Sequence, residues 1–311
     1  MGRSSNHKRH LPSAFTTLSP ALFLALTTVG SAQSLEPRAY SPSPIGANFA
    51  VIGLSESSGS VLLDPSLPVT NVTARIYGTA LAYGHTFAWL GRQALVTTAF
   101  PYAWGNLQGQ VSQTSTSLRR SGAGDLQARF SVNVLGSPAL SPQAFAKEPE
   151  RFILGTSLTI VAPTGQYDPA RLINIGTNRW AFKPELGVSY PWKKFVLDFY
   201  AGAWFFADNR NFYPGQATKR QDPLTEVQGH LSYTFKPRLW LAFDSTWYGG
   251  GASTVNHVPD NDRQSNSRAG VTLSLPLGRA QSLKTFYSRG VTARSGQEFT
   301  SYGMGYQVVW F

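Results

Sequence analysis

The segment PLTEVQGHLSYTFKP, residues 223–237, decides the fold class. Its odd positions are mostly apolar and its even positions are polar: Val227, Leu231, Tyr233 and Phe235 alternate with Glu226, Gln228, His230, Ser232, Thr234 and Lys236. Because successive side chains of a β-strand point to opposite faces, this pattern predicts a strand with one apolar and one polar face. Such a strand fits the wall of a membrane β-barrel, with a soluble β-sandwich as the alternative.

The same alternation recurs along the chain in twelve stretches: 46–62, 71–89, 93–105, 123–136, 151–162, 179–190, 195–207, 223–236, 239–249, 267–275, 282–293 and 299–311. Most of them have the length that a tilted strand needs to cross a bilayer, about 9–11 residues. An even strand number is also typical of single-chain bacterial barrels. The sequence therefore predicts an all-β fold, an antiparallel transmembrane β-barrel of about twelve strands with an up-and-down meander, in which the last strand pairs with the first.

The connections between these stretches alternate in length. Short turns are expected at 90–92, 191–194 and 237–238, and long polar loops at 106–122, 163–178, 208–222 and 250–266. Outer-membrane barrels have short periplasmic turns and long outer loops. One periplasmic connection, residues 137–150, is long, and Pro142 begins a short predicted helix within it.

Residues 1–32 have the pattern of a cleaved signal peptide. A basic start is followed by the apolar run FTTLSPALFLALTTVG and by small residues that end at Ala32. The predicted organisation is a signal peptide at 1–32, a short N-terminal periplasmic segment at 33–45 and one barrel at 46–311. The expected location is the outer membrane of a Gram-negative bacterium.

Composition excludes several classes of function. The formal charge is +11, but the basic residues are scattered, so we do not expect nucleic acid as a partner. The chain has no cysteine, and no dense group of His, Asp and Glu predicts a metal or another cofactor. The expected partners are membrane lipid and lipopolysaccharide, a small solute, and the barrel-insertion machinery, which would recognise the C-terminal Phe311.

The eight tryptophans fall near the ends of the expected strands: Trp89, Trp104, Trp180, Trp192, Trp204, Trp240, Trp247 and Trp310. This placement is typical of the aromatic girdles at the two surfaces of a membrane.

The polar strand faces should line the barrel lumen. Their charged residues and histidine are Arg75, Asp125, Arg129, Arg151, Arg179, Lys183, Glu185, Asp198, Glu226, His230, Lys236, Asp244, Arg268 and Lys284. They could pair with one another and fill the interior, or they could form a constriction that selects solutes by charge. Because eight are Lys or Arg and five are Asp or Glu, the second alternative favours anions or aromatic acids.

A group of polar residues also marks the expected outer loop 163–178. Asp168, Arg171, Asn174 and Asn178 could constrict the channel if this loop folded inward. The alternative is an ordered loop that packs at the rim.

Several stretches resemble a family of bacterial outer-membrane proteins labelled as phenol-degradation meta-pathway proteins or transporters. They are LEPRAYSPSPIGANFAVIG, APTGQYDPARLINIGTNRWAFKPELGVSY, TEVQGHLSYTFKPRLWLAFDSTWYGGG and SRAGVTLSLPLGRAQSLKTFYSRGVTARSGQEF. The resemblance implies an outer-membrane β-barrel and the passage of small molecules, aromatic ones among them. It implies no catalytic residues.

Three functions are consistent with these observations. The first is a channel for diffusion of small solutes, with anionic and aromatic compounds as candidates. The second is a plugged barrel that acts through its outer loops as an adhesin, receptor or structural protein. The third is a barrel hydrolase with His230 as the base, although Ser232 on the same strand face would be about 6–7 Å away.

Overall fold

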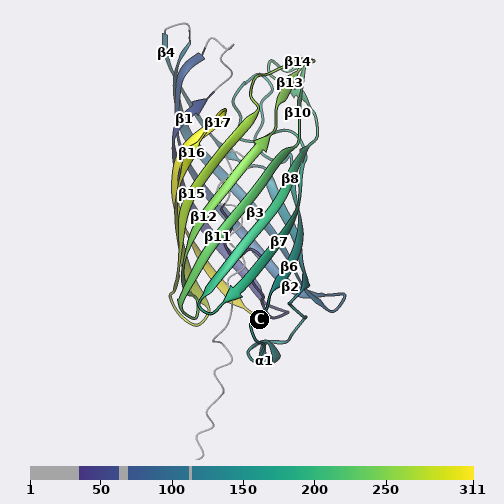
Figure 1. Ribbon diagram of the computed structural model, residues 1–311. Coiled ribbons are helices and arrows are strands. Elements are labelled where there is room, and N and C mark those ends of the chain that lie inside the picture. The colour runs from purple at the N-terminus through teal and green to yellow at the C-terminus, as the bar shows by residue number, and fades with distance from the viewer. Residues whose placement is uncertain (1–34, 63–68, 112–113) are drawn as a thin grey trace, which may run out of the picture.

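The computed structural model describes residues 35–62, 69–111 and 114–311, and it shows a closed antiparallel barrel of twelve strands (Figure 1). The barrel strands are β1 (Asn48–Leu62), β2 (Val69–Trp89), β3 (Arg92–Val111), β5 (Leu126–Leu135), β6 (Ile153–Ala162), β7 (Ala181–Trp192), β8 (Phe195–Phe206), β11 (Leu224–Lys236), β12 (Leu239–Gly250), β15 (Gln264–Pro276), β16 (Gln281–Thr292) and β17 (Gly296–Trp310). Each pairs with its neighbours in this order, as in a meander. The predicted fold class is confirmed. The predicted signal peptide, residues 1–32, lies outside the described residues.

The first and last strands close the barrel. β1 pairs with β17 along its whole length, from Asn48 opposite Trp310 to Leu62 opposite Gly296. This pairing satisfies backbone groups that would otherwise form an open sheet edge in lipid. The prediction that the final strand pairs with the first is confirmed.

Burial follows the alternation on which the prediction depends. On β11 the polar residues Glu226, Gln228 and His230 are buried inside the barrel, whereas Leu231 is exposed on the outside. Polar side chains therefore face inward and apolar side chains face outward, which is the reverse of their distribution in a soluble protein.

The outer surface carries an apolar belt. On β2 its outward positions run from Phe87 to Tyr77, ten residues apart. That distance is about 33 Å along a strand and about 25 Å along the membrane normal at the usual tilt, which matches the apolar band of outer-membrane barrels. Trp204 and Trp240 do not belong to this belt, because both are buried and face the lumen. The girdle prediction is wrong for these two residues.

At one end of the barrel the strands continue beyond this belt (Figure 1). β4 (Thr114–Ala123) pairs with the end of β3 as a hairpin, and β9 (Asn209–Phe212), β10 (Ala217–Gln221), β13 (Ser253–Val255) and β14 (Val258–Pro259) form a separate four-stranded sheet. The predicted loops at 106–122, 208–222 and 250–266 thus contain strands. Their Ser, Thr, Asn and Gln residues form strands that face water on both sides, so they lack the apolar alternation by which the other strands were identified.

The opposite end has the short turns. Three of these turns contain residues with positive φ: Leu90 and Gly91 in the first, Lys193 in the second and Arg238 in the third. The predicted helix in the long connection is present as α1 (Pro142–Phe145), where the hydroxyl of Ser141 accepts from the amide of Ala144. Among the described residues no helix has the length and apolar character needed to cross a membrane.

Candidate functional site

An extended N-terminal segment, residues 35–47, lies inside the barrel. Its side chains Glu36, Arg38 and Tyr40 are buried and contact inward-facing residues of several strands. We call residues 35–47 the lumen segment. The sequence predicted that residues 33–45 form a periplasmic segment. This prediction is wrong for the described residues 35–45, which lie inside the barrel. The physical reason is that the lumen segment brings an acid, a base and a phenol to complementary groups on the inner wall.

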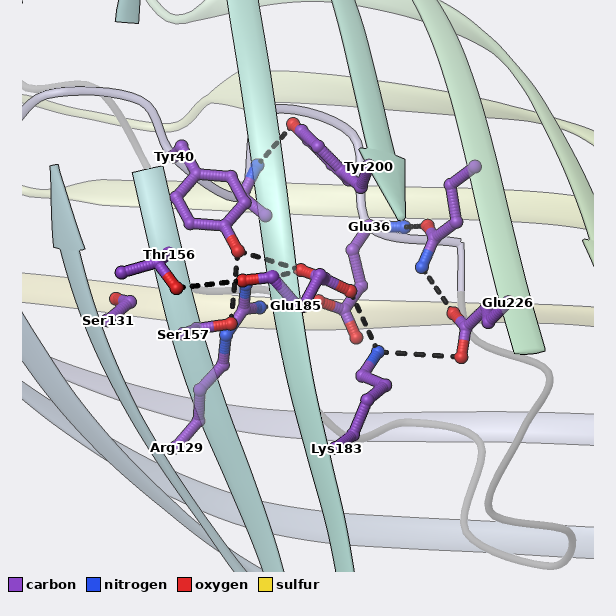
Figure 2. Close-up of polar contacts among 12 residues, drawn as sticks. Glu36, Tyr40, Arg129, Ser131, Thr156, Ser157, Lys183, Glu185, Tyr200 and Glu226 are labelled. Atoms are coloured by element: carbon purple, nitrogen blue, oxygen red, sulfur yellow. Dashed lines mark hydrogen bonds and ion pairs between the residues drawn. The ribbon is translucent and has the colours of Figure 1, made fainter. Parts of the chain in front are cut away.

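Arg129 on β5 joins two acids among the contacts drawn in Figure 2. Its Nη1 lies 2.7 Å from Glu36 Oε2 of the lumen segment, and its Nη2 lies 2.9 Å from Glu185 Oε1 on β7. All three side chains are buried, so each charge depends on the others for compensation. The segment is thereby joined by an ion pair to the inner wall.

The charged contacts continue around the wall. Lys183 Nζ lies 3.0 Å from Glu185 Oε2 and 3.5 Å from Glu226 Oε2 on β11. Glu226 Oε2 also accepts from the indole nitrogen of Trp204 at 3.0 Å. We call the ion-paired series Glu36, Arg129, Glu185, Lys183 and Glu226 the charge ladder, because acid and base alternate along it.

The ladder extends through hydrogen bonds to β12 and β15. Gln228 donates through its Nε2 to Glu226, and its Oε1 lies 3.1 Å from His230 Nε2. On the other side of the ring, His230 Nδ1 lies 2.7 Å from Asp244 Oδ1. Thr272 donates to Asp244 Oδ2 at 2.7 Å. Both ring nitrogens of His230 are therefore engaged by Asp244 and Gln228. This geometry gives His230 a structural role and leaves neither nitrogen for a serine hydroxyl, as a hydrolase base would require.

A second contact of the lumen segment is made by Arg38. Its amide donates to Asp198 Oδ2 at 3.2 Å, and its Nη2 donates to Thr234 Oγ1 at 2.6 Å. The guanidinium lies 4.8 Å from the ring centre of Trp240, and Lys284 Nζ lies 5.4 Å from the same ring centre. Two cations thus flank one buried indole, an arrangement stabilised by the electrostatics of the ring faces.

Tyr40 occupies a position that the wall shapes for it. Gly155 on β6 and Gly187 on β7 are paired, and a Cβ at either would overlap the Tyr40 ring. The phenol donates to Glu185 Oε1 at 2.9 Å and lies 3.0 Å from Ser157 Oγ.

The inner wall on the other side is different. There the inward positions of β17, β1, β2 and β3 are mostly Gly, Ala and Ser: Gly53, Ser55, Ser57, Ala80, Ala82, Gly84, Ala99, Ala103, Gly105, Ser301, Gly303 and Gly305. We call this the small-residue wall. Towards the short-turn end it becomes an apolar cluster that includes Phe49, Val51, Leu95 and Val309.

Ten of the fourteen predicted lumen residues are buried within the barrel: Asp125, Arg129, Lys183, Glu185, Asp198, Glu226, His230, Asp244, Arg268 and Lys284. Six of them belong to the charge ladder and its extension, namely Arg129, Lys183, Glu185, Glu226, His230 and Asp244. Arg268 lies apart from these and donates to Ser288 and Ser301 and to the carbonyl of Phe299.

Three predicted lumen residues lie elsewhere. Arg75 is on the outer face and pairs with Glu56 at 3.4 Å. Arg151 precedes β6 and pairs with Glu148, and Lys236 is exposed after a register shift at the end of β11. The prediction placed Arg75 on the wrong face of β2, because a shift by one residue exchanges the two faces of a strand. Arg151 and Lys236 lie where regular strand geometry ends.

Arg179 is at the outer mouth and is only partly buried. Its guanidinium lies 4.5 Å from the ring centre of Phe206 and donates to Gln221. Burial lowers the pKa of Arg179 to about 10.

These placements change the predicted charge balance of the interior. The buried wall has four bases, Arg129, Lys183, Arg268 and Lys284, and five acids, Asp125, Glu185, Asp198, Glu226 and Asp244. Arg38 and Glu36 of the lumen segment add one of each. The basic excess that favoured anions is therefore absent from the described interior.

The outer loop between β6 and β7 is ordered by its own polar residues. Arg171 pairs with Asp168 at 2.9 Å, Asn174 bonds to the backbone of both, and Asn178 donates to Asn209. Buried Asp125 fixes the loop by accepting from the amides of Gly165 and Thr177. These contacts order the loop against Asp125, directly before β5, and against Asn209 of the outer sheet.

Glu36, Arg38 and Tyr40 were not predicted from the sequence as residues of the site. The available signal was an acid, a base and an aromatic residue within five positions, directly before the first strand. Trp204 was not predicted as a lumen residue either, although alternation places it on the same face of β8 as Asp198.

The comparisons with known proteins agree with this architecture. A family model described as "Putative MetA-pathway of phenol degradation" matches residues 53–306. No curated protein matches the sequence significantly.

Two solved structures have a similar fold. An outer-membrane channel from Pseudomonas putida F1 is 21% identical, with 89% of this chain and 100% of that chain covered and a TM-score of 0.75. The β domain of the Bordetella autotransporter BrkA is 12% identical, with 86% and 100% covered and a TM-score of 0.51. The family match spans most of the sequence, and the chain therefore belongs to the phenol-degradation MetA-pathway family.

Proposed function

We propose that this protein is an outer-membrane channel for small solutes, narrowed by its own N-terminal segment. The observation that carries the proposal is the lumen itself. A closed barrel surrounds a buried charge ladder, and the lumen segment is held against that ladder by the pair between Glu36 and Arg129. A barrel of this size without the segment would leave a wider interior.

The proposed passage runs along the small-residue wall. Gly and Ala side chains occupy little of the lumen, and Ser55, Ser57 and Gly303 on this wall are partly exposed. The charged groups of the ladder side, by contrast, are 1–8% exposed. A solute would therefore move between the lumen segment and the wall of β17, β1, β2 and β3.

The solute class that fits best is small and aromatic. The family description, which refers to phenol degradation, supports this class. The nearly even charge of the interior favours an uncharged phenol-like solute over a simple anion.

The proposed location is the outer membrane of a Gram-negative bacterium. The N-terminal signal sequence would direct export of the chain and then be cleaved. The apolar belt and the barrel fold support this location. Recognition of Phe311 by the insertion machinery belongs to the same proposal.

The test is permeation by the refolded mature protein. Liposomes with the protein should take up phenol-sized aromatic solutes faster than a sugar of similar mass, and planar bilayers should show small, stable conductance steps. Uptake equal to that of protein-free liposomes, together with silent bilayers, would reject the channel.

A second candidate is a sealed barrel that acts through its outer strands. The observation that favours it is the burial of Glu36, Arg129, Glu185 and Lys183 in one connected network, which fills part of the lumen. A correctly folded but impermeable protein would support this candidate.

A further inference from the structure

The outer face of the barrel has an aromatic row near the end with the long strands. Strand pairing places Tyr287, Tyr302, Glu56, Tyr77 and Trp104 side by side on β16, β17, β1, β2 and β3. Directly paired residues point to the same face, so this row faces lipid with the apolar belt. Tyrosine and tryptophan in such a row mark the boundary between hydrocarbon and headgroups.

The next outward row, two residues further from the membrane centre, is basic. Pairing places Arg289, Thr300, Ser58, Arg75, Asn106 and Arg119 side by side, from β16 across to β4. We call Arg289, Arg75 and Arg119 the arginine row. At about 4.8 Å per strand, Arg75 lies about 14 Å from Arg289 and about 10 Å from Arg119 around the barrel.

The arginine row is confined to one side of the barrel. On the long-strand halves of β5, β6, β7, β8, β11, β12 and β15, the outward positions carry no charged residue. Two acids accompany the row on the same face, Glu56 below it and Glu298 above it. Glu56 lies 3.4 Å from Arg75, whose side chain is 64% exposed.

Height and charge together specify a ligand. The row lies about 5 Å above the aromatic boundary along the membrane normal, which is the level of lipid headgroups rather than of acyl chains. Guanidinium groups bind phosphate through paired N–H donors, and they retain their charge at any physiological pH. Exposed arginines at this height, next to an apolar surface for acyl chains, fit a phosphorylated lipid.

We propose that the arginine row on β16, β2 and β4 docks the phosphorylated headgroup of an outer-leaflet glycolipid, whose acyl chains cover the belt below it. This inference rests on the proposed outer-membrane location. Glu56 pairs with Arg75 and partly neutralises the positive charge that Arg75 contributes to the row. The docked lipid would seal the barrel on the side where β1 and β17 close it.

The probe is diphosphoryl lipid A, with the same lipid stripped of its phosphates as the comparison. Both are titrated onto the folded full-length mature protein in detergent, with binding measured by native mass spectrometry. The variant R75Q/R119Q/R289Q removes the row, and roughly fivefold weaker binding per arginine is expected from the usual contribution of a basic side chain at an anionic surface. E56Q should strengthen binding, because it releases Arg75.

The matched control is R210Q/R220Q/R263Q, which removes three exposed arginines from the outer sheet and its loops. Its affinity for lipid A should be within about twofold of that of the unsubstituted protein, since these residues lie beyond the headgroup level. Equal affinities for the row variant and the control, or for the lipid with and without phosphates, would overturn the inference. The conductance of the row variant is recorded in parallel. Conductance tests the channel proposal and lipid A binding tests the docking proposal, so either one can fail without the other.

Discussion

The two halves of the inner wall differ in almost every property. From β5 to β12 the wall presents the charge ladder, with Arg129, Lys183 and Glu226 buried and joined by ion pairs. From β17 to β3 it presents Gly, Ala and Ser with few hydrogen bonds between side chains, such as that between Ser57 and Ser301 at 2.8 Å. The lumen segment lies against the first half and is bonded to it.

This difference indicates that the interior charges are primarily structural. Buried charges are tolerated when each has a partner, and Glu36 supplies one of the partners of Arg129. The ladder thereby fixes the segment on one side, and the proposed passage would run along the small-residue wall on the other. The charges of this barrel would set the width of the passage more than its ion selectivity.

The largest effect is expected from Arg129→Met. This change leaves Glu36 and the nearby Glu185 with one fewer buried cation, which should lower the free energy of unfolding by about 3–5 kcal/mol. Urea unfolding in lipid vesicles measures it. Arg151→Gln is the control, because that exposed pair with Glu148 should contribute at most about 1 kcal/mol. Similar losses for both variants would contradict the structural role of the ladder.

Leu231→Arg tests the outward face of the ladder half. Leu231 faces lipid near the middle of β11, and arginine there should cost about 2–4 kcal/mol. Thr225→Arg lies on the same face at the outer end of β11 and should cost no more than about 1 kcal/mol. The same unfolding assay compares them, and an absence of depth dependence would refute the assignment of faces.

Gly187→Ala tests the position of Tyr40. The added methyl group would overlap the Tyr40 ring, so we expect about 1–3 kcal/mol of destabilisation and a looser lumen segment. Gly229→Ala is matched to it, because Gly229 is on β11 and a Cβ there meets no atom within 4 Å. Hydrogen exchange of the amides of residues 36 and 38–41 reports the loosening. Unchanged protection in the Gly187 variant would show that Tyr40 does not anchor the segment.

Ser57→Phe should affect stability least and permeation most. Ser57 points into the lumen from the small-residue wall, and a phenyl ring there should reduce conductance by at least about half if the passage runs along this wall. Ser58→Phe places the same ring on the outer face and should leave conductance unchanged. Equal conductance in the two variants would place the passage elsewhere.

The fold was predictable from the sequence because membrane and lumen impose opposite demands on alternate residues. β11 shows this best: every polar residue from Glu226 to Ser232 is inward. Prediction failed where this demand ends. The hairpin of β3 and β4 and the outer sheet face water on both sides, so their strands show no alternation.

The site was predictable only in part. Alternation identified the buried charges of the ladder but not their partners, since contacts across a barrel depend on strand register and on distant segments. It misplaced Arg75, where a shift by one residue exchanges the two faces. The position of Glu36 could not be derived, because an extended segment before the first strand has no periodicity that shows which surface it contacts.

The most direct test of the account compares the single-channel conductance of the mature protein with that of a variant lacking residues 35–41. Both are refolded into planar bilayers, and heat-modifiable mobility confirms folding. If the lumen segment narrows the passage, the variant should conduct severalfold more than the intact protein. Equal conductance in the two folded proteins would contradict the account.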